Sequence, residues 1–233
     1  MHTELWAGAM LHLDPLIEAD PGNPQFRSRR GQAHAALGHW AEAAADFAKS
    51  LEGEGYVQMA GWQTLCLAGA EDWAAHRQAC GRILQRLEGT GDPQTVDVLA
   101  WYCVRFREGC ADPSQPLKLA EQAVAASPQN LNVLKTLGAA LYRAGRYADA
   151  IKKEEEGNRL QKFEGTAYDW LFLALAHHQL KHAVEARKWL TNAQQWLDQA
   201  KDEEPGGPTL SWDRRLELQL IRAEAEALIG KGQ

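Results

Sequence analysis

The feature that most constrains this chain is an internal repeat: two distant segments carry the same pattern of small and aromatic residues. Four positions coincide at a single offset of 107 residues, which chance rarely produces. The coincident pairs are Gly31 with Gly138, Gly38 with Gly145, Trp40 with Tyr147, and Ala43 with Ala150. A third copy follows, in which Ala174 lies 36 residues after Gly138 and Ala186 takes the place of Ala150. This periodicity predicts an array of similar helical units that bury their apolar faces on one another.

Each repeated position has a mechanical reason in a pair of packed helices. The small residue (Gly31, Gly138 or Ala174) lets the two helices of a pair approach closely. Gly38 and Gly145 end the first helix, where a residue with a left-handed backbone is favoured. The aromatic residue two positions later wedges the turn. These residues resemble the tetratricopeptide repeat (TPR) family, whose period of about 34 residues fits roughly three times into the offset.

Composition narrows the classes of function that the chain can have. It is that of a soluble, folded protein, with 45% hydrophobic and 24% charged residues. The net charge of −6 argues against nucleic-acid binding, which needs a concentrated Lys/Arg face. No segment approaches the ~20 apolar residues of a membrane span, and the N-terminus, which carries Glu4, does not look like a secretory signal. The four cysteines include no CxxC pair, so we expect reduced, mostly buried thiols in a cytoplasmic protein.

The repeat pattern predicts an all-α fold: a right-handed α-solenoid of TPR helix pairs with a C-terminal capping helix. We expect a single solenoid over 1–233, made of a half-repeat at 1–21, about five helix pairs at 24–202 and a capping helix at 209–230. The expected helices are 3–19 (with a break at Asp14 and Pro15 as the alternative), 24–37, 40–52, 56–69, 71–88, 94–107, 115–126, 130–143, 147–161, 167–180, 183–200 and 211–229.

The last expected helix follows the clearest loop of the chain, at 203–208. Its apolar stripe at helical spacing consists of Trp212, Leu216, Leu220, Ala223 and Ala227. We predict that this stripe covers the last repeat around Trp189, Leu190 and Ala193, because an open solenoid end would expose its core. A detachable lid, or a handle for a neighbouring domain, is the alternative. Segments 169–190 and 212–228 also resemble TPR regions at the C-terminus of large bacterial multidomain proteins that often carry a Ser/Thr kinase or WD40 part.

The resemblance to the TPR family implies a binding surface. In that family, partners usually lie against the first helix of each pair, at its second, fifth, ninth, twelfth and thirteenth positions. Carried over to this chain, the candidate groove residues are Gln25, Ser28, Gln32, Asn132, Lys135, Tyr142, Arg143, Tyr168, Leu171, Leu175 and His178. Family members that clamp a peptide carboxylate have Asn at the ninth position. Gln32, Ala139 and Leu175 stand there, so we do not expect a carboxylate clamp.

The sequence gives little support for catalysis or for a metal site. His178 and His182 share a helical face beside His177, but a closed zinc site needs further ligands and no HExxH motif is present. No serine lies in a G-x-S-x-G motif. We therefore predict a non-catalytic scaffold without cofactor or metal that binds a protein or peptide in its groove. The alternative is an architectural or self-association module, in which the groove is filled by another copy or by the chain's own terminal helix.

One helix contains residues that do not suit its predicted place. Glu154 and Gly157 stand where a TPR helix normally has a large apolar residue and an alanine, and the run 152–156 is polar all round. We predict that this helix is the least tightly packed of the chain. Glu154→Leu should raise the melting temperature if Glu154 only fills a core position, and should not do so if Glu154 has a polar partner.

Overall fold

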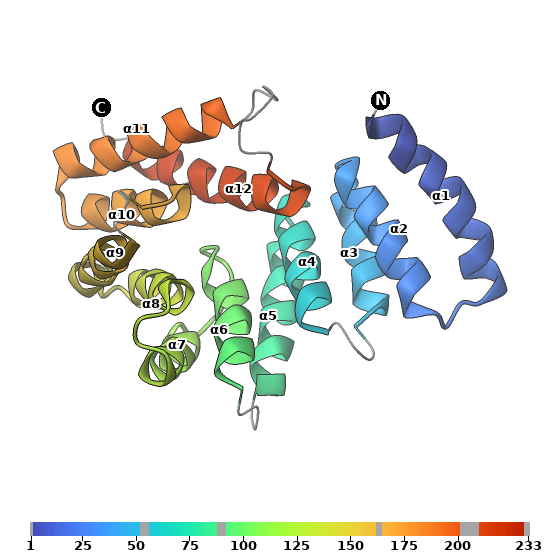
Figure 1. Cartoon of the computed structure of the whole chain (residues 1–233), viewed down its shortest axis with the longest axis horizontal. Coiled ribbons are helices and arrows are strands. Elements are labelled where there is room, and N and C mark those ends of the chain that lie inside the picture. The colour runs from blue at the N-terminus through green and yellow to red at the C-terminus, as the bar shows by residue number, and fades with distance from the viewer. Residues whose placement is uncertain (1, 52–55, 88–91, 162–164, 201–209, 231–233) are drawn as a thin grey trace. The chain divides into compact units, whose positions relative to one another are not determined.

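The computed structural model describes residues 2–51, 56–87, 92–161, 165–200 and 210–230, and this part of the chain contains twelve helices and no strand (Figure 1). The helices are α1 (His2–Ala19), α2 (Pro24–Ala36), α3 (Trp40–Lys49), α4 (Tyr56–Gly69), α5 (Trp73–Leu87), α6 (Pro93–Val104), α7 (Ser114–Ala126), α8 (Leu131–Arg143), α9 (Tyr147–Gln161), α10 (Ala167–Gln179), α11 (Ala183–Gln199) and α12 (Trp212–Ile229). All twelve expected helices are present. The loop expected at 203–208 lies outside the described residues.

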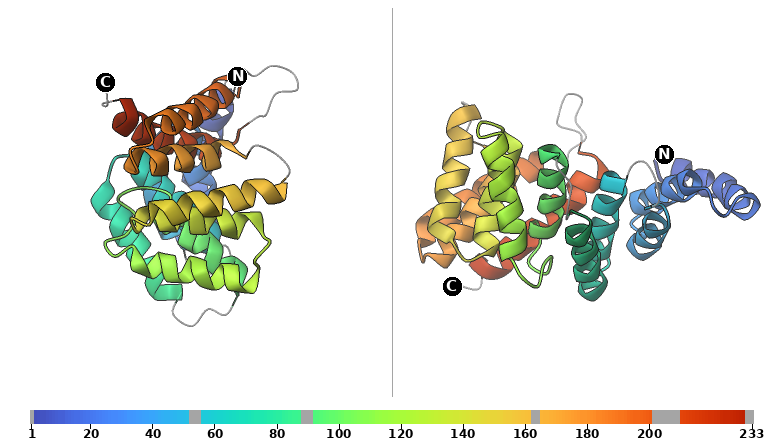
Figure 2. Two further views of the ribbon diagram at one scale, coloured as in Figure 1. Left: turned by 90° about the vertical axis from the view of Figure 1, so that its left-hand side faces the viewer. Right: turned by 90° about the horizontal axis from the view of Figure 1, so that it is seen from below.

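The chain divides into two compact units, 1–83 and 84–233. Unit 1 holds α1 to α4 and most of α5, and unit 2 holds the remaining helices. Within unit 2, α8 packs on α9 and α10 packs on α11 as hairpin pairs (Figures 1 and 2). Since each unit is described by itself, the expectation of one solenoid over 1–233 stays a prediction.

The turns of the helix pairs confirm the role predicted for the repeated glycines. Gly38 and Gly145 have φ angles of +79° and +77°, in the left-handed region where a side chain is strained. The third copy has a non-glycine residue at the same position: Lys181, 36 residues after Gly145, has a φ of 64°. Glu71, between α4 and α5, has a φ of 58°. The turn geometry is therefore kept even where the glycine is not.

The repeated small residues lie where the two helices of a pair come closest. A Cβ atom placed on Gly31 would lie 2.8 Å from Cε1 of Phe47, and one placed on Gly138 would lie 2.2 Å from Oε1 of Glu154. Such distances leave no room for a methyl group unless the neighbour moves. In the third copy Ala174 is itself fully buried. The predicted close approach is confirmed.

α1 runs without a break through the exposed Pro15, as expected. Other helix boundaries differ from the expected ones, and two of them have local reasons. α5 begins at Trp73 rather than at 71, because Asp72 accepts a hydrogen bond from the amide of Ala75 in the manner of an N-cap. α6 ends at Val104 instead of 107, where the chain folds back so closely that a Cβ on Gly109 would lie 2.1 Å from the Cys103 carbonyl oxygen.

The buried face of α12 matches the predicted stripe only in part. Leu216 is buried as predicted and Trp212 and Leu220 are half-buried, but Ala223 and Ala227 are exposed. The buried residues are Leu216, Glu217, Leu218, Ile221, Ala225 and Ile229. The prediction followed alanines as if they were apolar anchors, whereas the longer aliphatic side chains lie on the neighbouring face and bury more area. This shift brings two carboxylates, Glu217 and Glu224, toward the other helices of unit 2.

Candidate protein-binding groove

In unit 2 the C-terminal helix α12 lies against α10 and α11 (Figures 1 and 2). Its Glu217 also reaches α6, and the carboxylate accepts three hydrogen bonds. Trp101 donates through Nε1 at 2.9 Å and Arg105 through Nη1 at 2.8 Å, both to Oε1. The hydroxyl of Tyr168 on α10 donates to Oε2 at 2.8 Å. All donors are held by other helices, so one buried carboxylate joins α6, α10 and α12.

Glu224, two turns further along α12, is held by Arg143 at the end of α8. The guanidinium faces both carboxylate oxygens, with Nη2 donating to Oε2 at 2.8 Å. Arg143 also donates from Nε to the carbonyl of Val104 at 2.8 Å and from Nη2 to that of Arg105 at 3.0 Å. These two bonds fix the guanidinium at the end of α6 through contacts that do not involve α12.

Both ion pairs are largely shielded from water. The side chains of Arg105 and Glu217 are 3% and 11% exposed, and those of Arg143 and Glu224 are 9% and 15% exposed. The Arg105 guanidinium also lies 4.9 Å from the ring centroid of Tyr102 and 5.1 Å from that of Phe106. Removing one partner of such a buried pair typically costs ~3–5 kcal/mol, because the other charge is left without compensation.

The surroundings of Glu217 also change the acidity of Tyr168, which contacts its carboxylate. The pKa of Tyr168 is raised well above its usual range, first by burial and then by the negative charge of Glu217. Tyr168 therefore stays protonated and acts as a hydrogen-bond donor to Glu217 at any physiological pH. On the side of α11 the contacts are more exposed: Gln194 donates to Glu226, and Arg222 pairs with Asp198.

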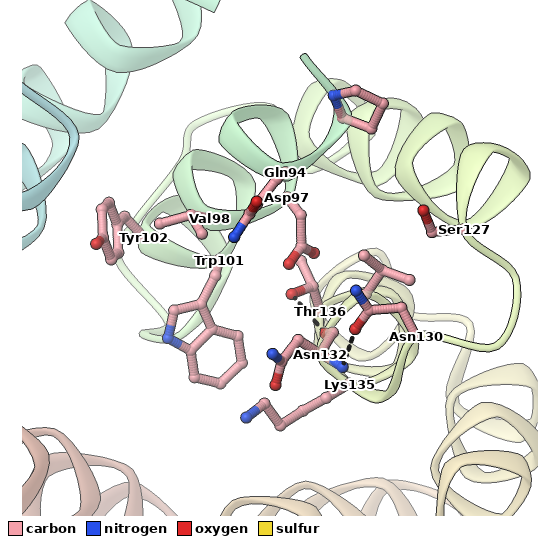
Figure 3. A pocket seen from close by; sticks show the side chains of 12 residues that line it. Gln94, Asp97, Val98, Trp101, Tyr102, Ser127, Asn130, Asn132, Lys135 and Thr136 are labelled. Carbon is pink, nitrogen blue, oxygen red and sulfur yellow. Dashed lines mark hydrogen bonds between the residues drawn. The ribbon is translucent and has the colours of Figure 1, made fainter. Parts of the chain in front are cut away.

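The surface between α6 and α8 contains an open pocket of about 430 Å³ (Figure 3). Its polar lining comes from the start of α8 and the residues before it (Asn130, Asn132, Lys135 and Thr136) and from α6 (Gln94 and Asp97). Trp101 and Tyr102 form an aromatic wall. Figure 3 shows the side chains of Asp97 and Thr136 turned toward one another, with Lys135 and Trp101 beside them.

Lys135 stands between this pocket and a second one. Its Nζ atom lies 5.4 Å from the ring centroid of Trp101 and 4.8 Å from that of Tyr168, within cation–π range. The second pocket, of about 350 Å³, reaches from Asn132 and Lys135 to Tyr168 on α10 and to Arg214 on α12. Asn132 and Lys135 line both pockets. Because the two pockets meet at these residues, we name them together the Lys135 groove, whose lining comes from α6, α8, α10 and α12.

Asp97 gives the Lys135 groove a buried acceptor. The residue is 5% exposed, and its enclosed Oδ1 atom has no hydrogen-bond partner among the described residues. Burial raises the pKa of Asp97, while its hydrogen bond with Thr136 and the positive charge of Lys135 act in the opposite direction. A buried oxygen without a partner costs roughly 1–3 kcal/mol. A ligand donor that reached it would recover part of that free energy.

The structure divides the groove residues expected in unit 2 into three environments. Asn132, Lys135 and Tyr168 line the Lys135 groove. Arg143 holds Glu224 of α12, and Tyr142 lines a further pocket of about 280 Å³ beside it. The third environment is the interior of the helix pair: Leu171 and Leu175 are 0% exposed, and His178 is half-buried.

In unit 1 the three expected groove residues lie on α2. Gln25 is exposed, and Ser28 and Gln32 are half-buried. The hydroxyl of Ser28 donates to the sulfur of Met59 on α4 at 3.1 Å.

Nothing in the sequence pattern identified Trp101, Arg105, Glu217 or Glu224 as functional. Their contacts join residues up to 116 positions apart, and helical spacing does not report such pairs.

The candidate histidine and cysteine residues contact one another or are buried in the fold. His177 and His182 face one another, with 3.2 Å between their Nδ1 atoms, and burial lowers the pKa of His177. Cys66, Cys80 and Cys103 are buried, as expected, and Cys110 is half-buried. In the described part of the chain no three His, Cys, Asp or Glu residues are grouped to hold a metal ion. No described helix combines the length and hydropathy that crossing a membrane requires.

Comparison with known proteins finds similarity to helical-repeat proteins. Residues 6–55 and 112–158 match the family model described as tetratricopeptide repeat. Among solved structures, a tetratricopeptide repeat protein from Parabacteroides merdae is similar with a TM-score of 0.56 and 13% identity, over 94% of this chain and 79% of that one. A TPR protein from Thermus thermophilus is similar with a TM-score of 0.53 and 18% identity, over 88% and 100% of the two chains.

A third similar structure is PilW, a type IV pilus biogenesis factor, with a TM-score of 0.53 and 16% identity, over 84% of this chain and 87% of that one. No curated protein is significantly similar to the chain in sequence. The similar structures show that the fold is an all-α helical-repeat solenoid.

Proposed function

We propose that the chain is a non-catalytic scaffold that binds a protein or peptide partner in the Lys135 groove. The observation that carries this proposal is that Asn132, Lys135 and the largely buried Asp97 line one pocket together with Trp101. The Lys135 ammonium can take a carbonyl or carboxylate of a partner, and the Asp97 carboxyl can take a donor. Trp101 and Tyr168 supply the large aromatic contacts that often dominate binding. An extended peptide segment presents all of these groups within a few residues.

Other parts of the proposal rest on composition and on resemblance. A net charge of −6 disfavours nucleic acid as the partner. We also propose a cytoplasmic location, because the sequence has only four cysteines and no CxxC pair. The resemblance of 169–190 and 212–228 to TPR regions of bacterial kinase or WD40 multidomain proteins extends the proposal to a module within a larger assembly. We propose no cofactor and no catalytic residue.

A second candidate function is an architectural or self-association role. It is favoured by the position of α12, which engages Arg143 and Tyr168, two residues expected in the binding groove. Groove residues that are bonded to the chain's own α12 have a structural role and are not available to a partner. The Lys135 groove beside it is open, and for that reason we prefer partner binding.

The test is a photo-crosslinking capture with two charge-reversal variants. A photoreactive amino acid replaces Gln94, at the edge of the Lys135 groove, and the crosslinked proteins from native lysate are identified by mass spectrometry. Lys135→Glu should abolish the crosslinks, whereas Lys118→Glu, at an exposed position on α7, should leave them intact. Crosslinks that survive Lys135→Glu would contradict the proposal. Capture of the bait alone, with dimers by light scattering, would favour self-association.

A further inference from the structure

The residues that hold α12 form a surface with its own chemistry. We call it the α12 seat and define it by Trp101, Arg105, Arg143 and Tyr168. It presents two guanidinium groups, one indole N–H and one phenol O–H, and all four donate to carboxylates of α12. Glu217 and Glu224 are seven residues apart, which puts them on one face of a helix about 10 Å from each other. The apolar residues Leu218, Ile221 and Ala225 lie along the same buried face.

The seat is positioned by contacts that do not include α12. Arg143 is bonded to two carbonyls at the end of α6. The ring of Trp101 packs edge-on against Tyr168 and Phe172, with centroids 5.7 and 6.0 Å apart. Arg105 lies against the rings of Tyr102 and Phe106. Preorganised donors bind a ligand without an ordering cost. These donors are thus arranged to receive a pair of carboxylates whichever helix brings them.

The contact also differs from what a permanent cap needs. In a helix that only covers apolar surface, replacing buried ion pairs by well-packed hydrophobic residues is often neutral or stabilising. In addition, α12 does not fill the space around it. The pocket of about 280 Å³ that contains Tyr142 borders Glu224 and Leu228, and the second pocket of the Lys135 groove borders Leu210 and Arg214.

We propose that the α12 seat is a binding site for an acidic amphipathic helix of a partner protein, and that α12 is its intramolecular occupant. The partner helix carries two carboxylates seven residues apart, with aliphatic residues one and four positions after the first. It displaces α12 by presenting the same groups to Arg105 and Arg143. This inference rests on the proposed function of the groove and names the kind of partner for the part of it that α12 covers.

The test uses a fluorescein-labelled peptide with the sequence of residues 210–230 as the probe and the full chain as the receptor. In the full-chain variant Glu217→Gln with Glu224→Gln, the resident helix is weakened and the seat is unchanged. We expect this variant to bind the probe at least tenfold more tightly than the wild-type chain in fluorescence anisotropy. A probe with the same two substitutions should bind at least tenfold more weakly than the wild-type probe. Adding Arg143→Gln to the receptor should abolish the gain.

Circular dichroism establishes that each receptor is folded, and the single variant Glu224→Gln, at the more exposed pair, serves if the double variant melts early. Folded variants that bind the probe no better than the wild-type chain would overturn the inference. Dimers that form by exchange of α12, detected by light scattering, would overturn it too, since the seat would then belong to a second copy. Either failure leaves the proposed function standing as long as crosslinks at Gln94 depend on Lys135.

Discussion

The helix pair α2–α3 in unit 1 and the helix pair α8–α9 in unit 2 have the same backbone arrangement but different side chains at their closest contact. In α2 and α3, Gly31 lies against the ring of Phe47; in α8 and α9, Gly138 lies against the carboxyl of Glu154. Phe47 is fully buried, and Glu154 is 3% exposed. The two side chains occupy equivalent positions, 107 residues apart. The glycine and the turn therefore determine how closely the helices pack, and the residue opposite them varies.

The difference has a cost in unit 2. The Oε1 atom of Glu154 is enclosed and has no hydrogen-bond partner among the described residues. Burial, followed by the negative charge of Asp169, raises the pKa of Glu154 well above its usual value. Asp169 itself closes a capping box with Thr166 at the start of α10. The sequence pattern predicted a loosely packed helix at this point, and that looseness stays a prediction. The structure shows a buried acid held against a glycine.

The largest loss of stability is expected from a substitution of Phe47, the apolar residue of the two. Phe47→Ala should destabilise the protein by roughly 3–5 kcal/mol, the usual loss for a buried Phe, because the ring packs both against Gly31 and against Trp62, whose centroid is 5.3 Å away. Urea denaturation followed by circular dichroism measures the loss. Leu16→Ala, at a position that is 44% exposed on α1, is the control and should cost less than about 1 kcal/mol. Equal losses would contradict the packing account.

The close approach itself can be tested with a methyl group. Gly31→Ala and Gly138→Ala should each destabilise the protein by about 1–3 kcal/mol through overpacking. Gly81→Ala in α5 is the matched control, because nothing lies within 4 Å of its added Cβ atom, and alanine should be neutral or stabilising there. In the Gly138→Ala background, Glu154→Ala should recover part of the loss by opening space. No recovery would show that Glu154 does not limit the approach of the helices.

The smallest effect is expected from the buried acid. Glu154→Leu should raise the free energy of unfolding by about 1 kcal/mol, since it removes an enclosed oxygen without a partner. The pH dependence gives an independent check. With a raised pKa in the folded state, Glu154 binds its proton more tightly there than in the unfolded chain, so its contribution falls as pH rises from ~4.3 through the folded pKa.

The Leu variant should therefore show a smaller decline of the melting temperature between acid and neutral pH than the wild-type chain. A lower melting temperature in the variant at all pH values would mean that Glu154 has a polar partner that stabilises the fold. That result would contradict the comparison with Phe47, because Glu154 would then stabilise the fold through a polar interaction and not merely fill a core position.

The sequence predicted the helices, their turns and the close approach of each pair, because these depend on local spacing and on residues with restricted roles. Gly38 and Gly145 are examples, because glycine at a repeated position predicts a left-handed backbone. Lys181 has the same backbone conformation, but its residue type does not predict it. The place of α12 was predicted only in part. Its periodicity identified an amphipathic helix, but the bonds from Trp101 and Arg105 to Glu217 span 116 and 112 positions. Contacts at that distance follow from tertiary packing.

Hydrogen exchange of α12, measured residue by residue with α8 and α10 as internal references, tests most directly whether this helix is an occupant of the groove or a fixed part of the fold. The account predicts that amides of 214–228 exchange faster than those of 133–143 and 169–179. It also predicts that Glu217→Gln with Glu224→Gln accelerates exchange in α12 alone, because the seat donors are held by other helices. Equal protection of the three helices, and a common acceleration of all three in the variant, would contradict it.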